Sequence, residues 1–309
     1  MTISATRIGD SPIIHQGMCE SLGDNINGPS LIERPAWAPG HGRYLLYFSH
    51  HKGQHIRLAF TDRLEGPWTI HMPGVLPLAS TPLAQTPPDV PQPDWAVAQG
   101  EDGLYPHLAS PDVWVDEDTR QFRMIFHGLA PSGEQVSYRA LSPDGLDWHV
   151  EGDAIPLVYV RRFVHGGQVY GLCHGGQLAR ERPDGGFDPG PFPIKGPIRH
   201  VAIAPRDDRA HVFFTRIGDA PERILHVELD LSGPWPDWRP CGPETEILRP
   251  ALGWEGADEP VEASRIGAVG FSNQLRDPEV FEAEGQVWII YAGGGEAALG
   301  LARIDDLHL

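Results

Sequence analysis

The chain has 309 residues, with 24 Lys and Arg against 42 Asp and Glu, so its formal net charge at pH 7 is −18. Its length suffices for one large domain or two ordinary ones, and its 40% hydrophobic content is typical of a soluble globular protein. An acidic surface repels phosphate backbones and anionic lipids, so we expect neither nucleic acid nor a membrane as a partner. Small neutral or cationic ligands fit this charge better.

The cysteines predict a reducing environment. Cys19, Cys173 and Cys241 are too few and too scattered for a disulfide framework, and none forms a C-x-x-C pair. The first ten residues lack the basic segment and apolar run of a secretory signal. We therefore expect a cytoplasmic protein, and the sequence leaves its oligomeric state open.

Frequent turns separate short apolar runs along the whole chain. The 36 Gly and 31 Pro residues are about twice the usual density of these two residue types. The runs are rich in β-branched and aromatic residues, each has the usual strand length, and no helical period persists for three turns. The sequence therefore predicts an all-β protein. The runs span 44–48, 56–60, 121–126, 136–140, 169–172, 211–215, 224–228, 287–291 and 299–303.

The predicted strands recur as a unit that closes on an aromatic residue near a Gly-Pro or Asp-Gly turn. Trp68, Trp148, Phe187 and Trp235 stand at this place in the first four units. A four-stranded sheet cannot bury both faces alone, so five units stacked around an axis predict a five-bladed β-propeller. Two β-sandwich domains are the alternative.

We expect one propeller domain over residues 1–309. Its blades are predicted at 28–70, 110–150, 155–187, 198–238 and 277–304, the last completed by an N-terminal strand around Ile13 and Ile14. Residues 73–106 and 244–274 do not fit a blade. Such inserted loops commonly shape a ligand site.

Two acidic residues are predicted where inner strands begin at the central channel. Asp112 and Asp277 each neighbour a proline near a predicted strand start. Carboxylates that face one another in a narrow, partly dry channel acquire separated pKa values, which glycoside cleavage requires of its acid and base. Each Asp could instead cap a tight turn beside its proline.

Five of the 15 histidines fall near the same ring. His200 follows Arg199 at a strand start, so it is a candidate general acid or an anchor for a water or metal. His50 and His51 follow the second strand of blade one, where a substrate contact and a solvated turn are almost equally expected. The other two are His107 and His127.

The inserted acidic loop and one turn of blade four supply further candidates. Trp254 lies beside Glu255 and Asp258, and an aromatic ring flanked by carboxylates is a typical sugar platform. Arg216 begins a charged turn that corresponds to the His50–His51 loop of blade one. A solvated or salt-bridged loop is the alternative for both segments.

The repeat and its motifs resemble the glycoside hydrolase family 43 superfamily, with families 32, 68 and 117 as relatives. The carriers are Gly28-Pro29-Ser30, 44–48, Leu64-Glu-Gly-Pro-Trp68, Ser110-Pro-Asp-Val113 and Arg276-Asp-Pro278. The resemblance implies an Asp base in blade one, an assisting Asp in blade two and a Glu acid in blade three.

The chain is atypical for that superfamily at two of these positions. Asp112 matches the blade-two Asp, but Gly28-Pro29 stands where the resemblance implies the base, and Arg161-Arg162-Phe163 offers no Glu in blade three. Family 117 uses His in place of the Glu acid, and His200 could take that part.

The expected function is an exo-acting, inverting glycosidase for a small carbohydrate, with Asp112, Asp277 and His200 as the catalytic set. Arg162 and Arg276 together favour an acidic sugar, because a guanidinium pairs a carboxylate bidentately. The alternatives are a noncatalytic sugar-binding propeller, or a non-hydrolytic enzyme such as a lyase that uses Tyr105 and His107. No cofactor is required, and a Ca²⁺ ion in the channel is optional. The expected substrate-binding residues are Asn27, His50, His51, His107, His127, Arg162, Arg216, Trp254, Glu255, Asp258 and Arg276.

Overall fold

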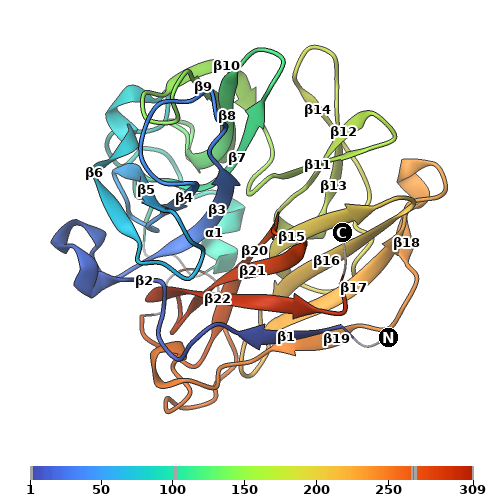
Figure 1. The fold of residues 1–309 in the computed structure, drawn as a ribbon. Coiled ribbons are helices and arrows are strands. Elements are labelled where there is room, and N and C mark those ends of the chain that lie inside the picture. The colour runs from blue at the N-terminus through green and yellow to red at the C-terminus, as the bar shows by residue number, and fades with distance from the viewer. Residues whose placement is uncertain (1–2, 100–102, 266, 268–269, 308–309) are drawn as a thin grey trace.

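Five antiparallel sheets stand around a central axis in the computed structural model, which describes residues 3–99, 103–265, 267 and 270–307 (Figure 1). Each sheet has four or five strands, and sheets that follow one another in the chain lie side by side in space. The predicted all-β, five-bladed β-propeller is confirmed.

The first strand of every blade lies on the channel, and the strands of blades one to four follow in chain order. Blade one consists of β3 (Asn27–Glu33), β4 (Tyr44–Ser49), β5 (His55–Thr61) and β6 (Thr69–Pro77), and blade two of β7 (Leu108–Asp116), β8 (Gln121–Leu129), β9 (Gln135–Ser142) and β10 (His149–Ile155). Blade three consists of β11 (Arg161–His165), β12 (Gln168–Leu172), β13 (Leu178–Glu181) and β14 (Phe187–Pro189). Blade four consists of β15 (Ile198–Arg206), β16 (Arg209–Arg216), β17 (Ile224–Asp230) and β18 (Arg239–Pro240), and β19 (Thr245–Leu248) also pairs with β17.

Both ends of the chain form the fifth blade. It consists of β20 (Leu275–Ala283), β21 (Gln286–Gly293) and β22 (Ala298–Asp305), and β22 pairs with β1 (Ser4–Arg7) and with β2 (Ile14–His15). The N-terminal strand expected around Ile13 and Ile14 is therefore the short β2, and the outer strand of the blade is mostly β1. This pairing closes the ring.

Alternating side chains explain why the blades stack. In β4, Leu45 and Tyr47 pack toward blade two, whereas Tyr44, Leu46 and Phe48 pack toward blade five. A strand period of two thus buries both faces of the sheet. Five hydrophobic clusters result, one between each pair of neighbouring blades.

A buried tryptophan anchors the outer turn of three blades. Nε1 of Trp68 donates to the carbonyl of Leu64, and Nε1 of Trp148 donates to that of Gly145. In blade four the equivalent residue is Trp238, which is 4% exposed. The expectation that Trp235 closes blade four was wrong, because Trp235 lies in the short 3₁₀ turn η5 (Trp235–Asp237) and is only partly buried.

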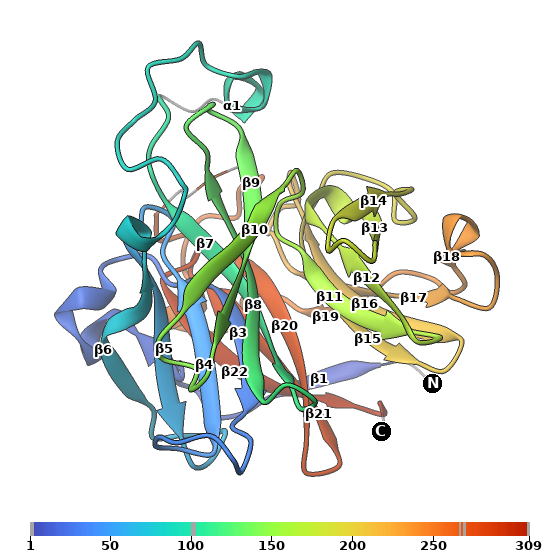
Figure 2. The same cartoon turned by 90° about the horizontal axis from the view of Figure 1, so that it is seen from above.

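The two inserted loops are shorter than expected, because part of each pairs with a blade. β6 continues to Pro77, and β19 adds residues of the second insertion to blade four. The first loop then carries α1 (Asp94–Gln99) and projects from one end of the propeller (Figure 2). The remaining 3₁₀ turns are η1 (Gln16–Met18), η2 (Glu20–Leu22), η3 (Leu78–Ser80), η4 (His174–Gly176) and η6 (Gly253–Glu255).

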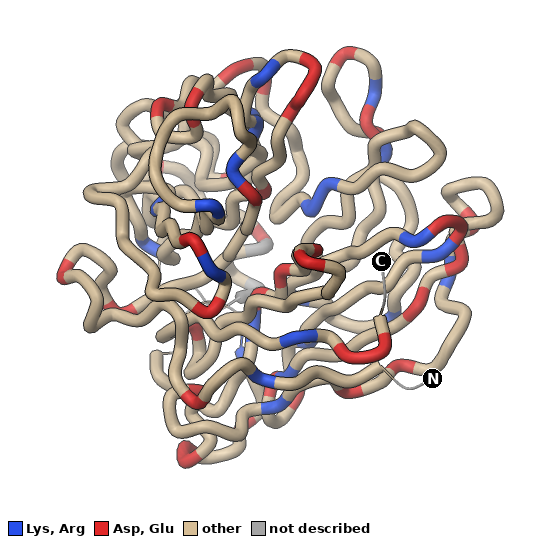
Figure 3. The backbone as a smooth tube through the Cα atoms, in the orientation of Figure 1, with Lys and Arg blue, Asp and Glu red and all other residues tan. Residues whose placement is uncertain are grey.

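Charged residues of both signs are distributed over all blades, with acidic stretches frequent in the outer turns (Figure 3). Within the described ranges, no helix is long and apolar enough to cross a membrane.

Candidate functional site

The inner strands enter the channel through a repeated backbone irregularity. In blades one, two, four and five, two consecutive residues of the first strand lie opposite a single residue of the second strand, so the pairing register shifts by one residue. The first residue of this bulge is Gly28, Ser110, Arg199 or Asp277, and Tyr159 stands two residues before β11 in blade three. Such bulges re-aim side chains and are common beside active sites.

Three non-glycine residues of this ring have left-handed backbone angles. The φ angle is 47° at Ser110, 53° at Tyr159 and 46° at Asp277. Each such residue costs about 1–3 kcal/mol, and strain of this kind clusters at functional sites. The fold therefore stores strain in the residues that it aims into the channel.

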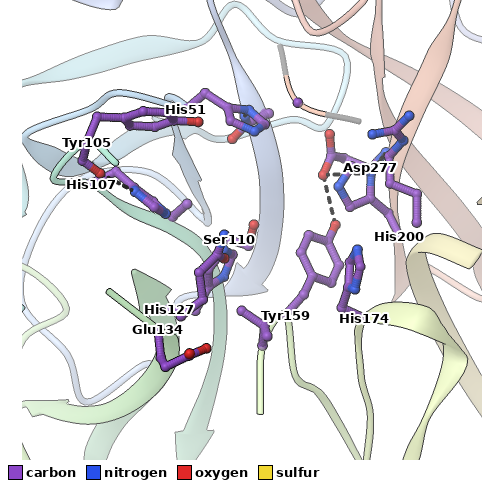
Figure 4. Close-up of a pocket in the computed structure, with 16 residues that line it drawn as sticks. His51, Tyr105, His107, Ser110, His127, Glu134, Tyr159, His174, His200 and Asp277 are labelled. Carbon is purple, nitrogen blue, oxygen red and sulfur yellow. Dashed lines mark hydrogen bonds and ion pairs between the residues drawn. The ribbon is translucent and has the colours of Figure 1, made fainter. Parts of the chain in front are cut away.

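A pocket of about 310 Å³ opens at this end of the channel, and residues from all five blades line it (Figure 4). Six of the expected site residues meet there: Asn27, His51, His107, His127, His200 and Asp277. The other lining residues are Tyr105, Ala109, Ser110, Glu134, Gln135, Val158, Tyr159, His174, Arg199 and Gly267.

Asp277 is a buried carboxyl with a strongly raised pKa in the pocket. Its side chain is buried, the Tyr159 hydroxyl donates to Oδ1 at 3.0 Å, and Oδ2 has no hydrogen-bond partner among the described residues. Burial and the charge of Glu296 raise its pKa to about 7, although the Tyr159 hydrogen bond opposes the rise. A free carboxyl oxygen that titrates near neutral pH suits proton transfer.

His200 is a neutral partner of Asp277. Its Nδ1 accepts a hydrogen bond from the Asp277 backbone N–H at 3.3 Å, and its ring stacks on Tyr159 with centroids 4.7 Å apart. Burial and the nearby Arg199 hold the pKa of His200 well below its usual range. At neutral pH, His200 therefore carries its proton on Nε2 and positions Asp277.

A second acid, Glu296, lies behind the pocket wall. It is fully buried in the turn between β21 and β22, with φ at 80°. Its Oε2 accepts from Asn25 and Asn27 and lies 2.9 Å from His51 Nδ1, while Oε1 accepts from Arg276. Burial opposes ionisation of Glu296, but the charge and hydrogen bond of His51 and the charge of Arg276 hold its pKa well below its usual range.

Arginines and acids alternate beneath the wall. Arg276 is completely buried between Glu222 and Glu296, and Nε of Arg199 donates to Glu222 at 2.7 Å. Arg276 also donates to Gln274 and to the carbonyls of residues 265 and 267. The expectation that Arg276 binds substrate was wrong, because every nitrogen of its guanidinium is already engaged inside the protein.

Three further histidines give the pocket a neutral polar wall. Burial lowers the pKa of His107 to about 4, and it lowers the pKa of His127 and of His174 as well. Nδ1 of His107 donates to the Tyr105 carbonyl, whereas His127 Nδ1 is buried without a partner among the described residues. Neutral imidazoles both donate and accept, as sugar hydroxyls do.

Arg161 closes the channel below the pocket. Its guanidinium donates to Tyr159 Oη and to the carbonyls of Pro29 and Pro111, and it lies 3.4–3.5 Å from the carboxylates of Asp112 and Glu279. The buried guanidinium of Arg161 thus fills the channel at this level.

Asp112 lies in this lower layer, outside the pocket lining. Its Oδ2 accepts the Arg162 backbone N–H at 3.0 Å, and the pairing register aligns it with Glu279 of blade five. Ser110 is the true counterpart of Asp277. The sequence interpretation therefore misaligned the two blades by two residues, because it matched the two aspartates although Asp112 follows the proline of its bulge and Asp277 precedes its own.

Four other expected binding residues have local partners away from the pocket. Arg162 stacks on Trp114, and Arg216 forms a bidentate pair with Glu244. His50 accepts from the Lys52 backbone N–H and lies 3.5 Å from Asp24. Asp258 is exposed on the acidic loop. None of the four lines the pocket as the described residues define it.

The expected sugar platform is part of blade five. Trp254 stacks on Tyr291, and the space above Gly293 and Gly300 is filled by its ring. Glu255 is fully buried and accepts from Arg7, Tyr291 and two backbone N–H groups. Glu255 is therefore not free to bind a ligand, whereas Trp254 is half-buried and lies outside the pocket lining as the described residues define it.

The sequence analysis missed Tyr159, His174, Glu134 and Glu296 as site residues. Glu296 did leave a signal, because it is a lone acid between three glycines and an apolar strand. Tyr159 and His174 lie in irregular segments with no such pattern.

The residues at the axis do not fit a calcium ion. Ca²⁺ takes six to eight oxygen ligands, whereas this pocket presents histidines and the cation of Arg161 fills the channel beneath it. Within the described part of the chain, no three His, Cys, Asp or Glu side chains form a metal-binding group.

Solved structures share this fold at low sequence identity. The α-L-arabinofuranosidase from Lactobacillus brevis superposes with a TM-score of 0.62 at 10% identity, covering 95% of this chain and 92% of that one. The GH43_1 enzyme from Xanthomonas citri complexed with xylose gives 0.60 at 11% identity, over 95% and 89%. An exo-1,5-α-L-arabinanase from a bovine ruminal metagenomic library gives 0.54 at 13%, over 91% and 92%.

The resemblance to glycoside hydrolase family 43 is thus confirmed for the fold. No protein-family model matches the chain. The uncharacterized protein R118 of Acanthamoeba polyphaga mimivirus is 33% identical, over 96% of this chain and 89% of that protein. The chain therefore belongs to the same family as protein R118, a family with the five-bladed propeller fold of the family 43 glycoside hydrolases.

Proposed function

We propose that the protein is an exo-acting, inverting glycoside hydrolase for a small carbohydrate. The observation that carries the proposal is Asp277, a buried carboxyl with a pKa of about 7 and an unpartnered Oδ2 in a pocket built by all five blades. In this proposal Asp277 is the general base that takes a proton from the attacking water.

The surroundings of Asp277 support this role. A base works best when its pKa lies near the operating pH, and here burial provides that pKa. The Tyr159 hydroxyl fixes the carboxyl, and His200 accepts the backbone N–H of Asp277. A carboxylate that activates water leads to inversion, whereas a carboxylate that attacks the anomeric carbon itself leads to retention. Asp277 would thus occupy in blade five the place that the family resemblance implies for blade one.

The shape of the pocket supports exo action. Arg161 and its acidic partners block the channel below, and the loop that carries Tyr105 and His107 forms one wall. The volume is at the lower end of the range for small-molecule sites, so the pocket suits a terminal residue rather than the middle of a polymer.

The composition of the pocket supports a polyhydroxylated ligand. Ser110, His107, His127 and His174 offer neutral donors and acceptors, and Nη1 of Arg199 has no hydrogen-bond partner among the described residues. The structural neighbours are an arabinofuranosidase, an arabinanase and an enzyme crystallised with xylose, which makes pentosides the first substrates to test.

The test is hydrolysis of a panel of aryl glycosides, beginning with α-L-arabinofuranosides and β-D-xylosides. We expect Asp277→Asn to lower kcat by 10²–10⁴-fold. The control His50→Gln should retain activity, because His50 lies outside the pocket. Proton NMR of the first product should show the inverted anomer.

Two results would overturn the proposal. Calorimetric binding of the sugars without hydrolysis by the wild-type protein would identify a carbohydrate-binding propeller instead. Unchanged turnover in Asp277→Asn would remove Asp277 from the mechanism.

A further inference from the structure

We infer that His51 is the proton donor to the leaving group and that Glu296 is its positioning residue. This inference rests on the proposed function, to which it adds the acid that neither blade one nor blade three supplies. Its basis is the contact between His51 and the buried carboxylate of Glu296. His51 and Asp277 line the same pocket (Figure 4).

His51 is fixed at both its backbone and its ring. Its backbone N–H donates to Asn25 Oδ1 at 2.8 Å, and its Nδ1 lies 2.9 Å from Glu296 Oε2. Glu296 is fully buried, whereas the His51 side chain is 27% exposed and lines the pocket. With Nδ1 held at the wall, Nε2 is the ring nitrogen left to meet a substrate.

Counting donors assigns the proton on Nδ1. Asn27 Nδ2 lies 2.9 Å from His51 Nδ1 and 3.0 Å from both Asn25 Oδ1 and Glu296 Oε2, so its two protons serve only two of these three contacts. We assign them to the two oxygens, and Asn27 Oδ1 accepts from Ser49. Nδ1 of His51 therefore donates to Glu296. This is the arrangement in which a carboxylate orients an imidazole and stabilises its protonated form.

The charges around His51 stabilise its imidazolium form. Glu296 and Asp277 raise the pKa of His51, and they outweigh burial and the opposing charge of Arg276. Three histidines that interact electrostatically with His51 are His50, His107 and His127, and their pKa values are all lowered, so they add little positive charge beside it.

His200 is less suited to this part, contrary to the family 117 analogy. Its Nδ1 faces the Asp277 backbone N–H, and burial with Arg199 keeps it neutral. A neutral imidazole that accepts a hydrogen bond at Nδ1 is a weak acid at Nε2. The structure thus separates two histidine roles that the sequence could not distinguish.

The resulting step is balanced without a cofactor. Water attacks the anomeric carbon and passes one proton to Asp277, while the glycosidic C–O bond breaks and the leaving oxygen takes the proton of His51 Nε2. A C–O bond forms and a C–O bond breaks, so the products are the free sugar and the free alcohol. Solvent then returns a proton to His51 and removes one from Asp277.

The experiment compares two leaving groups in His51→Gln. The 2,4-dinitrophenolate of a 2,4-dinitrophenyl glycoside leaves without a proton donor, whereas the methoxide of a methyl glycoside of the same sugar needs one. We expect kcat on the methyl glycoside to fall by 10²–10⁴-fold and kcat on the dinitrophenyl glycoside to change by less than about tenfold. His50→Gln is the matched control, since it changes the preceding histidine outside the pocket.

Glu296→Gln tests the positioning role, because the amide cannot stabilise the imidazolium. The basic limb of the kcat/KM profile should move to lower pH while KM changes little. NMR of wild-type His51 should give a pKa above 6.5, and the variant should lower it; this readout needs no substrate.

The outcomes are distinguishable. Equal losses on both leaving groups would make His51 a binding residue, and unchanged rates or a His51 pKa below 6.5 would remove it as the acid. A wild-type protein that cleaves neither glycoside would overturn the proposed function itself.

Discussion

The hydroxyl of Tyr159 donates to Oδ1 of Asp277 at 3.0 Å and accepts from Nη2 of Arg161 at 3.2 Å, so a single side chain links the pocket to the closed channel below it. Oδ2 of Asp277 is buried and has no hydrogen-bond partner among the described residues. One oxygen is thus fixed while the other is unpaired, which suits a general base.

Removing this hydroxyl should shift the pH profile upward. The Tyr159 hydrogen bond lowers the pKa of Asp277, so in Tyr159→Phe that pKa should rise above its present value of about 7. A hydrogen bond of about 0.5–1.5 kcal/mol corresponds to roughly 0.4–1.1 pH units. The acid limb of kcat/KM should therefore move to higher pH by that amount. An unchanged acid limb would show that Asp277 does not control the rate.

The missing base of blade one has a steric cause. Gly28 has φ at 55°, and a Cβ built on it would lie 2.8 Å from the Ser110 Cα and 3.0 Å from Ser49 Oγ. Ser49 itself donates to Asn27 and accepts from the Ser110 backbone N–H, so blades one and two are joined at this point. No side chain fits at position 28 without moving backbone.

Gly28→Asp should therefore fail to restore a blade-one base. We expect it to lower stability by about 1–3 kcal/mol and to reduce activity, because it combines an overpacked contact with a strained φ. Urea unfolding and aryl-glycoside hydrolysis check both points. Increased turnover in this variant would mean that blade one still holds a competent base position.

The sequence predicted the architecture well because the propeller signal is repeated. Alternating apolar residues, as in β4, recur in every blade and point to two buried faces. The channel residues were harder to predict. Asp112 was taken as the partner of Asp277 because each lies beside a proline, but Asp112 follows its proline and Asp277 precedes its own. In the structure Asp112 lies 3.5 Å from Arg161 in the layer below.

Burial decided the other differences. Trp254 and Glu255 have the composition of a sugar platform, but Glu255 is fully buried against Arg7, and Trp254 is half-buried on Tyr291. His51 and His200 have the same chemistry in the sequence. They differ in the structure because one lies beside Glu296 and the other beside Arg199.

Glu255 should matter for stability rather than for catalysis. It is fully buried and holds Arg7 of β1, so it ties the N-terminal strand to blade five. Glu255→Gln should lower the free energy of unfolding by about 2–3 kcal/mol, because one partner of a largely buried ion pair is lost. Glu244→Gln, at the exposed pair with Arg216, should cost less than about 1 kcal/mol. Equal costs in urea unfolding would contradict this assignment, as would loss of activity in folded Glu255→Gln.

Acid should destabilise the fold partly through blade four. His226 lies 3.0 Å from His211 between β16 and β17, and burial together with the charge of His211 lowers its pKa to about 4. The unfolded chain binds this proton near pH 6.5 and the folded chain only near pH 4, so stability is lost as pH falls through that interval. At pH 4.5 the loss amounts to about 2 kcal/mol. His226→Leu should therefore lose less stability than the wild-type protein between pH 7.5 and pH 4.5, as measured by urea unfolding at both pH values. An equal loss in the two proteins would mean that His226 takes up its proton without cost to the fold.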